Sequence, residues 1–98
     1  KNKNILDKLG IALTDITKDK YEFDILFVLL QDKIFGSKYS RISLKKMKEI
    51  TEFSRNKINN VIKKYETKLN KIKSNPVIYE IKDNFIEELL YQNDIKEV

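Results

Sequence analysis

A dense group of hydrogen-bond donors lies between residues 54 and 64, in the segment SRNKINNVIKK. Four of these eleven residues are cations, three are asparagines, and only three are apolar. Arginine binds guanine through paired hydrogen bonds, asparagine can bind adenine in the same way, and lysine mainly contacts phosphate. If the segment is a helix whose apolar positions face inward, the donors remain free to contact a nucleic acid. The candidate donors are Ser54, Arg55, Asn56, Lys57, Asn59, Asn60, Lys63 and Lys64.

Charge is distributed unevenly along the chain. The 98 residues carry 20 cations and 15 anions, a formal net charge of +5. Residues 37–75 carry twelve cations and three anions, a net charge of +9, whereas residues 76–98 carry a net charge of −4. A concentrated basic region is typical of a protein that contacts a polyanion. This region supplies further candidate contacts, which are Arg41, Lys45, Lys46, Lys71, Lys73 and Asn75.

These candidates also have plainer interpretations. A lysine run such as Lys45, Lys46 and Lys48 is usually a solvated helix face, and Lys71 and Lys73 are equally compatible with a solvated hairpin. Asparagine is a mediocre helix former, so three of them within two turns require either base contacts or mutational drift in AT-rich coding. We expect base contacts, because drift does not explain why acidic residues avoid the middle of the chain.

The composition argues against an enzyme and against a membrane protein. The chain has no His and no Cys, which removes the commonest general base, thiol chemistry and most transition-metal sites. Two Gly residues cannot supply a glycine-rich phosphate loop. We therefore expect no catalytic residue, no metal and no cofactor. The longest apolar run, Ile25–Leu30, is too short to span a bilayer, so we expect a cytoplasmic protein, associated with the nucleoid if it is prokaryotic.

The elements that must position these donors are mainly helical. In the first third of the chain, the pattern predicts a short helix, Ile5–Leu9, that ends at Gly10. Asp19 and Glu22 form a candidate capping box for a second helix, Tyr21–Ile34. Because that helix is apolar on nearly all sides, we expect it in the centre of the domain or at a subunit contact.

Two capped helices are predicted next, preceded by a candidate brief strand at residues 39–42. Ser43 is expected to cap Leu44–Thr51, and Ser54 to cap a helix from Arg55 to about Asn70. The apolar positions expected to dock inward are Leu44, Met47 and Ile50 in the first helix and Ile58, Val61, Ile62, Tyr65 and Leu69 in the second. A hairpin of residues 71–73 and 77–81 and a final helix, Asn84–Gln92, complete the chain.

The segment ISLKKMKEITEFSRNKINNVIKKYETKLNKI resembles the helix-turn-helix of winged-helix DNA-binding proteins. The shared features are a Ser-capped first helix, a Thr-x-Phe-Ser turn, and apolar residues four, seven and eight positions after Ser54. Upstream, ILDKLGI followed by YEFDILFVLL is similar to the opening of archaeal and bacterial winged-helix regulators. Two positions depart from the family: Lys48 replaces a small residue, and Glu52 replaces a turn glycine and would need a left-handed backbone.

The resemblance covers roughly residues 21–92 and implies a mainly α (α+β) fold, a winged helix-turn-helix, in a single domain of residues 1–98. It implies a helix-turn-helix at about 44–70, a wing of two or three strands at about 71–81, and a C-terminal helix at about 84–92. With the basic middle, it predicts sequence-preferring binding of double-stranded DNA through a recognition helix at 55–70. A prokaryotic-type transcriptional regulator is the leading interpretation.

A homodimer is expected, because the all-round apolar helix and the C-terminal apolar stripe exceed what a small monomer easily buries. Two alternatives remain open. One is a winged-helix protein-interaction module of a larger assembly, and the other is the DNA-binding part of a plasmid or viral replication or partition factor. The sequence indicates no pocket for a small-molecule effector and leaves the target DNA open.

Overall fold

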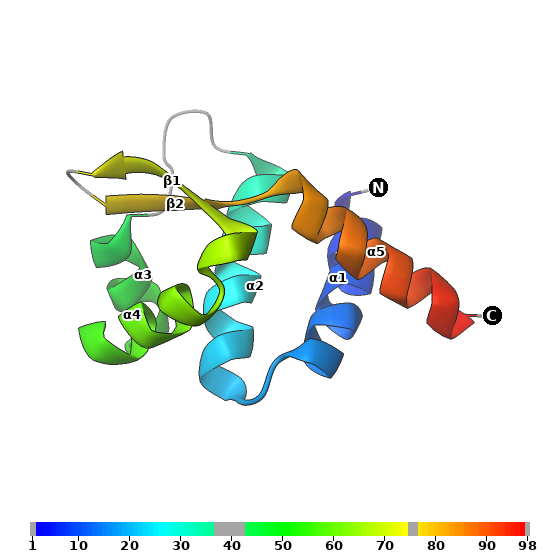
Figure 1. The fold of residues 1–98 in the computed structure, drawn as a ribbon, viewed down its shortest axis with the longest axis horizontal. Coiled ribbons are helices and arrows are strands. Elements are labelled where there is room, and N and C mark those ends of the chain that lie inside the picture. Colours follow the sequence, from blue (N-terminus) through cyan, green and yellow to red (C-terminus); the bar gives the residue numbers. More distant parts are fainter. Residues whose placement is uncertain (1, 37–42, 75–76, 98) are drawn as a thin grey trace.

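A central helix separates two packed groups of elements in the computed structural model of the chain (Figure 1). The structure describes residues 2–36, 43–74 and 77–97, with side chains from residue 4 to residue 91 within those ranges. The described elements are mainly helical with one two-stranded antiparallel sheet, which confirms the mainly α (α+β) expectation. They are α1 (Asn2–Ile16), α2 (Lys20–Phe35), α3 (Leu44–Thr51), α4 (Arg55–Lys64), the short 3-10 helix η1 (Glu66–Lys68), β1 (Leu69–Ser74), β2 (Val77–Ile81) and α5 (Asp83–Glu97).

Helix α2 lies at the centre and contacts α1, α3, α4 and β2. It begins at Lys20, one residue before the predicted start. Asp19 caps it as predicted, because its carboxylate accepts a hydrogen bond from the Glu22 backbone N–H at 3.0 Å, but the Glu22 carboxylate accepts from the Lys18 N–H rather than completing a capping box with Asp19. Its fully buried side chains include Ile25, Leu26 and Leu30. The sequence predicted either the domain centre or a subunit contact for this helix. The described contacts place it in the domain centre, with its apolar sides packed against other elements of the same chain.

Helix α1 is longer than predicted. It continues through Gly10 to Ile16, so the expectation of a helix that ends at Gly10 was wrong. Leu9 and Leu13 are fully buried against the core, and this packing offsets the cost of about 1 kcal/mol that a glycine adds inside a helix. The missing side chain also has a use, since a Cβ on Gly10 would lie 3.2 Å from a ring carbon of Phe27 on α2.

Helices α3 and α4 are joined by the tight turn that the sequence predicts. The Ser43 hydroxyl accepts from the Lys46 N–H at 3.1 Å and caps α3, and Ser54 caps α4 in the same way through the Lys57 N–H at 3.3 Å. Glu52 adopts the left-handed conformation, with φ 61° and ψ 16°, and its N–H donates to the Lys48 carbonyl at 2.9 Å. The turn is therefore built with a non-glycine residue in a glycine-type conformation.

Inward docking of these two helices is confirmed except at Ile50. Met47, Ile58 and Ile62 are buried, but Ile50 is 49% exposed. Residues three apart drift by about 60° around a helix, so the third member of a 44–47–50 series leaves the buried face. Thr51 instead continues that face, and its hydroxyl donates to the Met47 carbonyl at 2.8 Å.

Helix α4 is shorter than predicted, ending at Lys64 rather than near Asn70. The backbone leaves the helix at Tyr65 and passes through η1 into β1. Leu69, which the sequence placed on the helix stripe, is buried on β1 opposite Ile81 instead. An apolar residue at position 69 fits both the periodicity of a helix and that of a strand. Leu69 is in a strand because it pairs with Ile81 on β2.

The β-hairpin pairs β1 with β2 over a longer range than residues 71–73 and 77–81. Its antiparallel register runs from Leu69 opposite Ile81 to Ser74 opposite Val77, with an irregularity between Lys71 and Lys73. Ser43 forms an isolated bridge with Ile78, which joins the start of α3 to the hairpin. The strand predicted at residues 39–42 lies outside the described residues.

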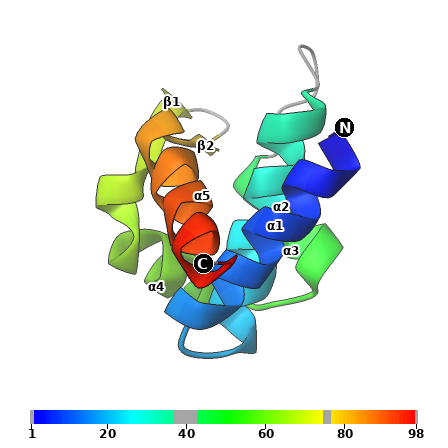
Figure 2. The same cartoon turned by 90° about the vertical axis from the view of Figure 1, so that its right-hand side faces the viewer.

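Helix α5 packs beside α1, as Figure 2 shows from the side. It runs from Asp83 to Glu97, longer than the predicted Asn84–Gln92, and buries Phe85 and Leu89 in the common core. An ion pair fixes its start, because the Lys33 ammonium on α2 lies 2.6 Å from Glu80 and 3.3 Å from Asp83. The hairpin and α5 are thereby both tied to the central helix.

Candidate nucleic-acid interface

The outward face of α4 carries only hydrogen-bond donors and acceptors. The buried stripe of Ile58, Val61 and Ile62 faces the core. Asn56 and Asn60, four residues apart, lie on the opposite side, and Lys63 follows three residues later on the same side. All three side chains of this outward face are exposed, and the described part of the chain offers them no hydrogen-bond or ion-pair partner.

The flank of α4 next to α2 is occupied by internal contacts. Lys57 and Lys64, seven residues apart, lie on this flank. The Lys57 ammonium is 4.6 Å from the centre of the Tyr21 ring, and the Lys64 ammonium is 2.8 Å from a Glu22 carboxylate oxygen. Two of the predicted contacts are therefore partly committed to holding α4 on α2, although both side chains are exposed.

Glu22 is a buried carboxylate, 6% exposed, at the centre of this contact. It accepts hydrogen bonds from the Lys18 N–H at 2.9 Å, the Lys64 ammonium at 2.8 Å and the Tyr65 hydroxyl at 2.7 Å. Burial alone would raise the pKa of Glu22, but these donors outweigh it and hold the pKa below its ordinary value. Burial, and then the Glu22 carboxylate, raises the pKa of Tyr65. No local pattern in the sequence connects Glu22 with Lys64 or Tyr65, which lie more than forty positions away.

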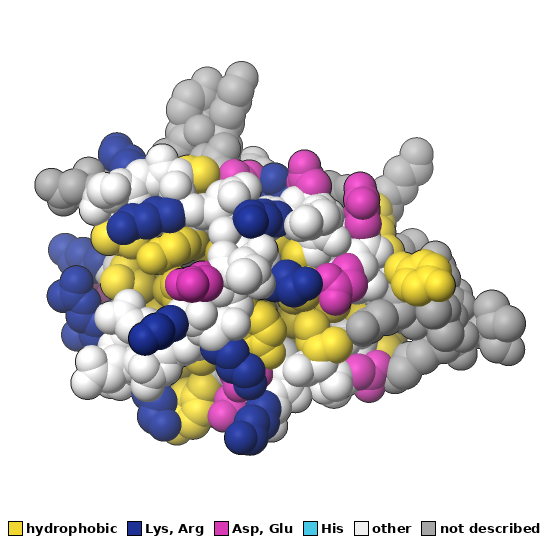
Figure 3. All heavy atoms as spheres, viewed as in Figure 1, with side chains coloured by type: hydrophobic (Ala, Val, Ile, Leu, Met, Phe, Trp, Pro, Cys, Tyr) yellow, Lys and Arg dark blue, Asp and Glu magenta, His cyan; other side chains and the backbone are white. Residues whose placement is uncertain are grey.

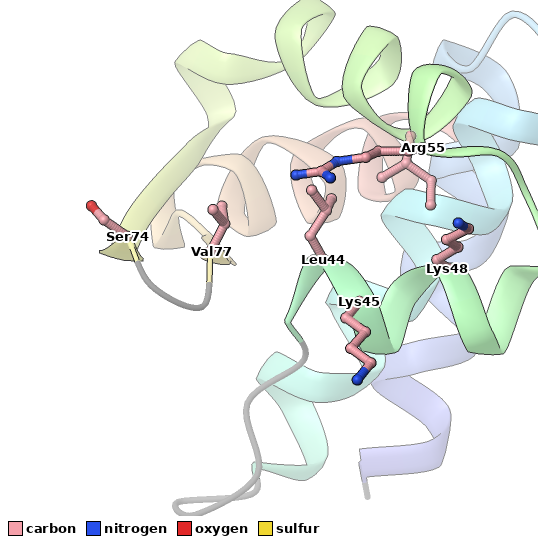
Figure 4. Close-up of a pocket in the computed structure, with 7 residues that line it drawn as sticks. Leu44, Lys45, Lys48, Arg55, Ser74 and Val77 are labelled. Carbon is pink, nitrogen blue, oxygen red and sulfur yellow. The ribbon is translucent and has the colours of Figure 1, made fainter.

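The other flank of α4 borders a groove between α3, the start of α4 and the hairpin. We call it the α3–α4 groove; its volume is about 480 Å³. Its lining residues are Leu44, Lys45, Lys48, Arg55, Ile58, Ser74 and Val77. In Figure 4 the Arg55 guanidinium extends over Leu44 toward the hairpin, the Lys48 ammonium points toward α4, and Lys45 points away. Lys48 was not among the predicted contacts, although it belongs to the same lysine run of α3 as Lys45 and Lys46.

A second hollow, of about 590 Å³, lies between the end of α4 and the hairpin. It brings together Asn59 and Lys63 from α4 with Lys71 from β1, beside the half-buried Tyr79. Glu66 also lines it and adds one negative charge to an otherwise basic surface. Predicted contacts from the helix and from the hairpin therefore meet at this hollow.

The remaining predicted residues are distributed around this end of the molecule. Lys46 is exposed in the first turn of α3, Lys73 is exposed on β1, and Ser54 is exposed while it caps α4. Arg41 and Asn75 lie outside the described residues. Figure 3 shows most Lys and Arg side chains of this face over α3, α4 and the hairpin, whereas several of the Asp and Glu side chains lie toward α5.

Comparisons with protein-family models, curated proteins and solved structures found no match to this chain. Within residues 2–36, 43–74 and 77–97, no cluster of three or more acidic, His or Cys side chains is arranged to bind a metal ion. Over the same ranges, no helix combines the length and apolar character needed to cross a membrane.

Proposed function

We propose that this chain is a winged-helix domain that binds double-stranded DNA, with α4 as the recognition helix and the β1–β2 hairpin as the wing. The observation that carries the proposal is the outward face of α4, where Asn56, Asn60 and Lys63 are exposed opposite the buried stripe. An α-helix with such a face fits the major groove of B-DNA. A transcriptional regulator is the role we favour, and a replication or partition factor would use the same contacts on a different DNA.

In this proposal the contacts divide into two kinds. The asparagines of the outward face read base edges, since an asparagine amide can form paired hydrogen bonds with adenine. Lysines of α3 and the hairpin, such as Lys46 and Lys73, neutralise phosphates and orient the protein on the duplex. If about five to eight phosphates are contacted per protomer, log Kd should change with log salt by roughly 0.9 per phosphate.

The experiment is fluorescence anisotropy of labelled duplexes, titrated with the protein at several salt concentrations. Duplexes selected from a random pool are compared with scrambled duplexes of equal length. We expect tight binding at low salt, a steep salt dependence and a clear preference for the selected sequences. Failure of the wild-type protein to bind any duplex at low salt would rule the proposal out.

We also propose a homodimer, based on exposed apolar side chains on α1 and α5. Ile11 is 56% exposed on α1 and Tyr91 is 66% exposed on α5. Pairing of these helices would present two copies of α4 to successive turns of one face of the duplex. Sedimentation equilibrium should give about twice the chain mass of 11.7 kDa, and Tyr91→Glu should return the mass to that of one chain. A single-chain mass for the wild type at micromolar concentration would contradict the dimer.

A protein-interaction role is a second candidate, because two apolar side chains are exposed near the proposed DNA surface. Ile50 is 49% exposed on α3 and Ile72 is 41% exposed on β1. Apolar side chains of this size suit a protein partner better than a phosphate backbone. Selection from the random pool separates the two roles: a shared enriched sequence supports the DNA reader, whereas equal, weak binding of all duplexes favours the protein partner.

A further inference from the structure

The α3–α4 groove combines an apolar floor with a cationic rim. Ile58 is fully buried beneath it, and Leu44 and Val77 are half-buried along its length. Arg55 and Lys48 supply the charged groups that face the groove, whereas the Lys45 ammonium points away from it, and none of the described lining residues is acidic. A surface of this composition fits an anion that also has a hydrocarbon part.

Arg55 belongs to this groove rather than to the outward face of α4. Successive residues of a helix are about 100° apart, so Arg55 and Asn56 point in different directions from the same turn. In Figure 4 the Arg55 guanidinium lies along the groove, over Leu44 and toward the hairpin. The outward face of α4 is therefore left to Asn56, Asn60 and Lys63.

The positive charges of the groove are not neutralised within the described part of the chain. Arg55 and Lys48, whose charged groups face the groove, are exposed and have no ion-pair partner there. Lys64, by contrast, is held by Glu22. Cations that converge on a groove without an acidic partner attract an anionic ligand, and guanidinium geometry favours the two oxygens of a phosphate group.

We propose that the α3–α4 groove binds one phosphodiester of the DNA backbone, with Arg55 and Lys48 holding the phosphate. The deoxyribose carbons on either side of that phosphate would pack on Leu44 and Val77. Arg55 is then a backbone contact and not a base-reading residue, and sequence preference resides in the asparagines of α4. This inference rests on the proposed function and assigns within it a site that includes Lys48.

Binding of a selected duplex and a scrambled duplex is measured by anisotropy over a range of salt for Arg55→Ala, Lys48→Ala and Asn60→Ala. We expect Arg55→Ala and Lys48→Ala each to weaken both duplexes by the same factor, about ten-fold. Together they should reduce the log–log salt slope by roughly one, which is the share of a single phosphate. The double variant should lose less than the product of the two factors, because both side chains hold one phosphate. Asn60→Ala should weaken the selected duplex alone.

Lys8→Ala is the matched control, because Lys8 is exposed on α1, which lies across α2 from α4 (Figure 1). Lys8→Ala removes one positive charge and should change neither the affinity at physiological salt nor the log–log salt slope. Circular dichroism establishes that each variant is folded, and Arg55→Gln provides a second variant at the same position.

Two results would overturn the inference while the proposed function stands. One is a loss at Arg55→Ala and Arg55→Gln that affects only the selected duplex, which would make Arg55 a base-reading residue. The other is an unchanged salt slope in all Arg55 and Lys48 variants. Absence of duplex binding by the wild-type protein would instead remove the proposed function itself, so the two failures are distinguishable.

Discussion

At the scale of single residues, Glu52 carries a conformational cost that its position imposes. It is the one non-glycine residue with positive φ among those described, and it ends α3. A left-handed conformation costs a residue with a Cβ about 1–2 kcal/mol. Glycine avoids this cost, but ordering its more flexible unfolded chain cancels part of the gain. We predict that Glu52→Gly stabilises the protein by about 0.5–1 kcal/mol, measured by urea denaturation.

The matched control for this prediction is Glu52→Ala. Alanine removes the carboxylate but keeps the Cβ, so its stability should stay close to that of the wild type. Equal stabilisation by both substitutions would show that the carboxylate, and not the backbone conformation, is the source of the cost.

Glu22 provides a second prediction at this scale, through pH. Because the pKa of Glu22 is lowered in the folded state, its contribution to stability is present above its unfolded pKa of about 4.3. That contribution is lost as the pH falls through the folded pKa. We predict that Glu22→Gln costs about 1–3 kcal/mol at neutral pH and that the cost shrinks in acid.

Urea denaturation of the wild type and of Glu22→Gln between pH 7 and pH 3 measures this effect. Tyr65→Phe is the control, since it removes one donor and leaves those from Lys18 and Lys64 in place. A difference between wild type and Glu22→Gln that is constant over the whole pH range would contradict the prediction.

At the scale of elements, the close approach of α1 to α2 depends on Gly10 and the Phe27 ring. Alanine at position 10 should gain about 1 kcal/mol of helix propensity but meet a ring carbon at 3.2 Å. We predict that Gly10→Ala changes the free energy of unfolding by less than about 0.5 kcal/mol in the wild type and raises it by about 1 kcal/mol in a Phe27→Leu background. Equal effects in both backgrounds, measured by thermal denaturation, would show that the ring does not oppose the added methyl group.

The elements also show which parts of the fold were predictable from the sequence. Capping by Asp19, Ser43 and Ser54 is local chemistry, and the helices that follow begin as predicted or one residue earlier. The ends of helices depend on distant partners: Gly10 stays helical because α2 packs on it, and Leu69 leaves α4 to pair with Ile81. Neither partner can be read from the residues near the helix end.

The sequence predicted which residues of the candidate site are exposed, but not how they are grouped in space. The donors of α4 are exposed as expected, since exposure follows from the apolar stripe. Their division into an outward face, a flank held by Tyr21 and Glu22, and a groove around Arg55 depends on where α2 and the hairpin lie. That placement brings residues together that are more than forty positions apart, as Glu22 and Tyr65 are.

At the scale of the whole molecule, α4 and the acidic helix α5 lie toward opposite ends of a body 43 Å long (Figure 1). Residues 76–98 carry a net charge of −4, and Glu87 is exposed on α5. The interaction between exposed charges extends over a Debye length, which is about 30 Å at 0.01 M salt but only about 8 Å at 0.15 M. We predict that Glu87→Lys raises duplex affinity a few-fold at 0.01 M salt and has no effect at 0.15 M.

Lys63→Ala is the comparison for this experiment, because a direct contact should weaken binding at both salt concentrations. Anisotropy titrations of the two variants at each salt concentration give the four values needed. An effect of Glu87→Lys that persists at 0.15 M would indicate that α5 touches the duplex.

The start of α1 and the end of α5 both lie on the side of the molecule away from α4 and the hairpin (Figures 1 and 2). An affinity tag, a fluorophore or a fused protein joined at either end would therefore be held clear of the exposed asparagines of α4. The chain can be tethered to a sensor surface through either end with those asparagines facing the flowing solution. Immobilised and free protein should then give the same dissociation constants.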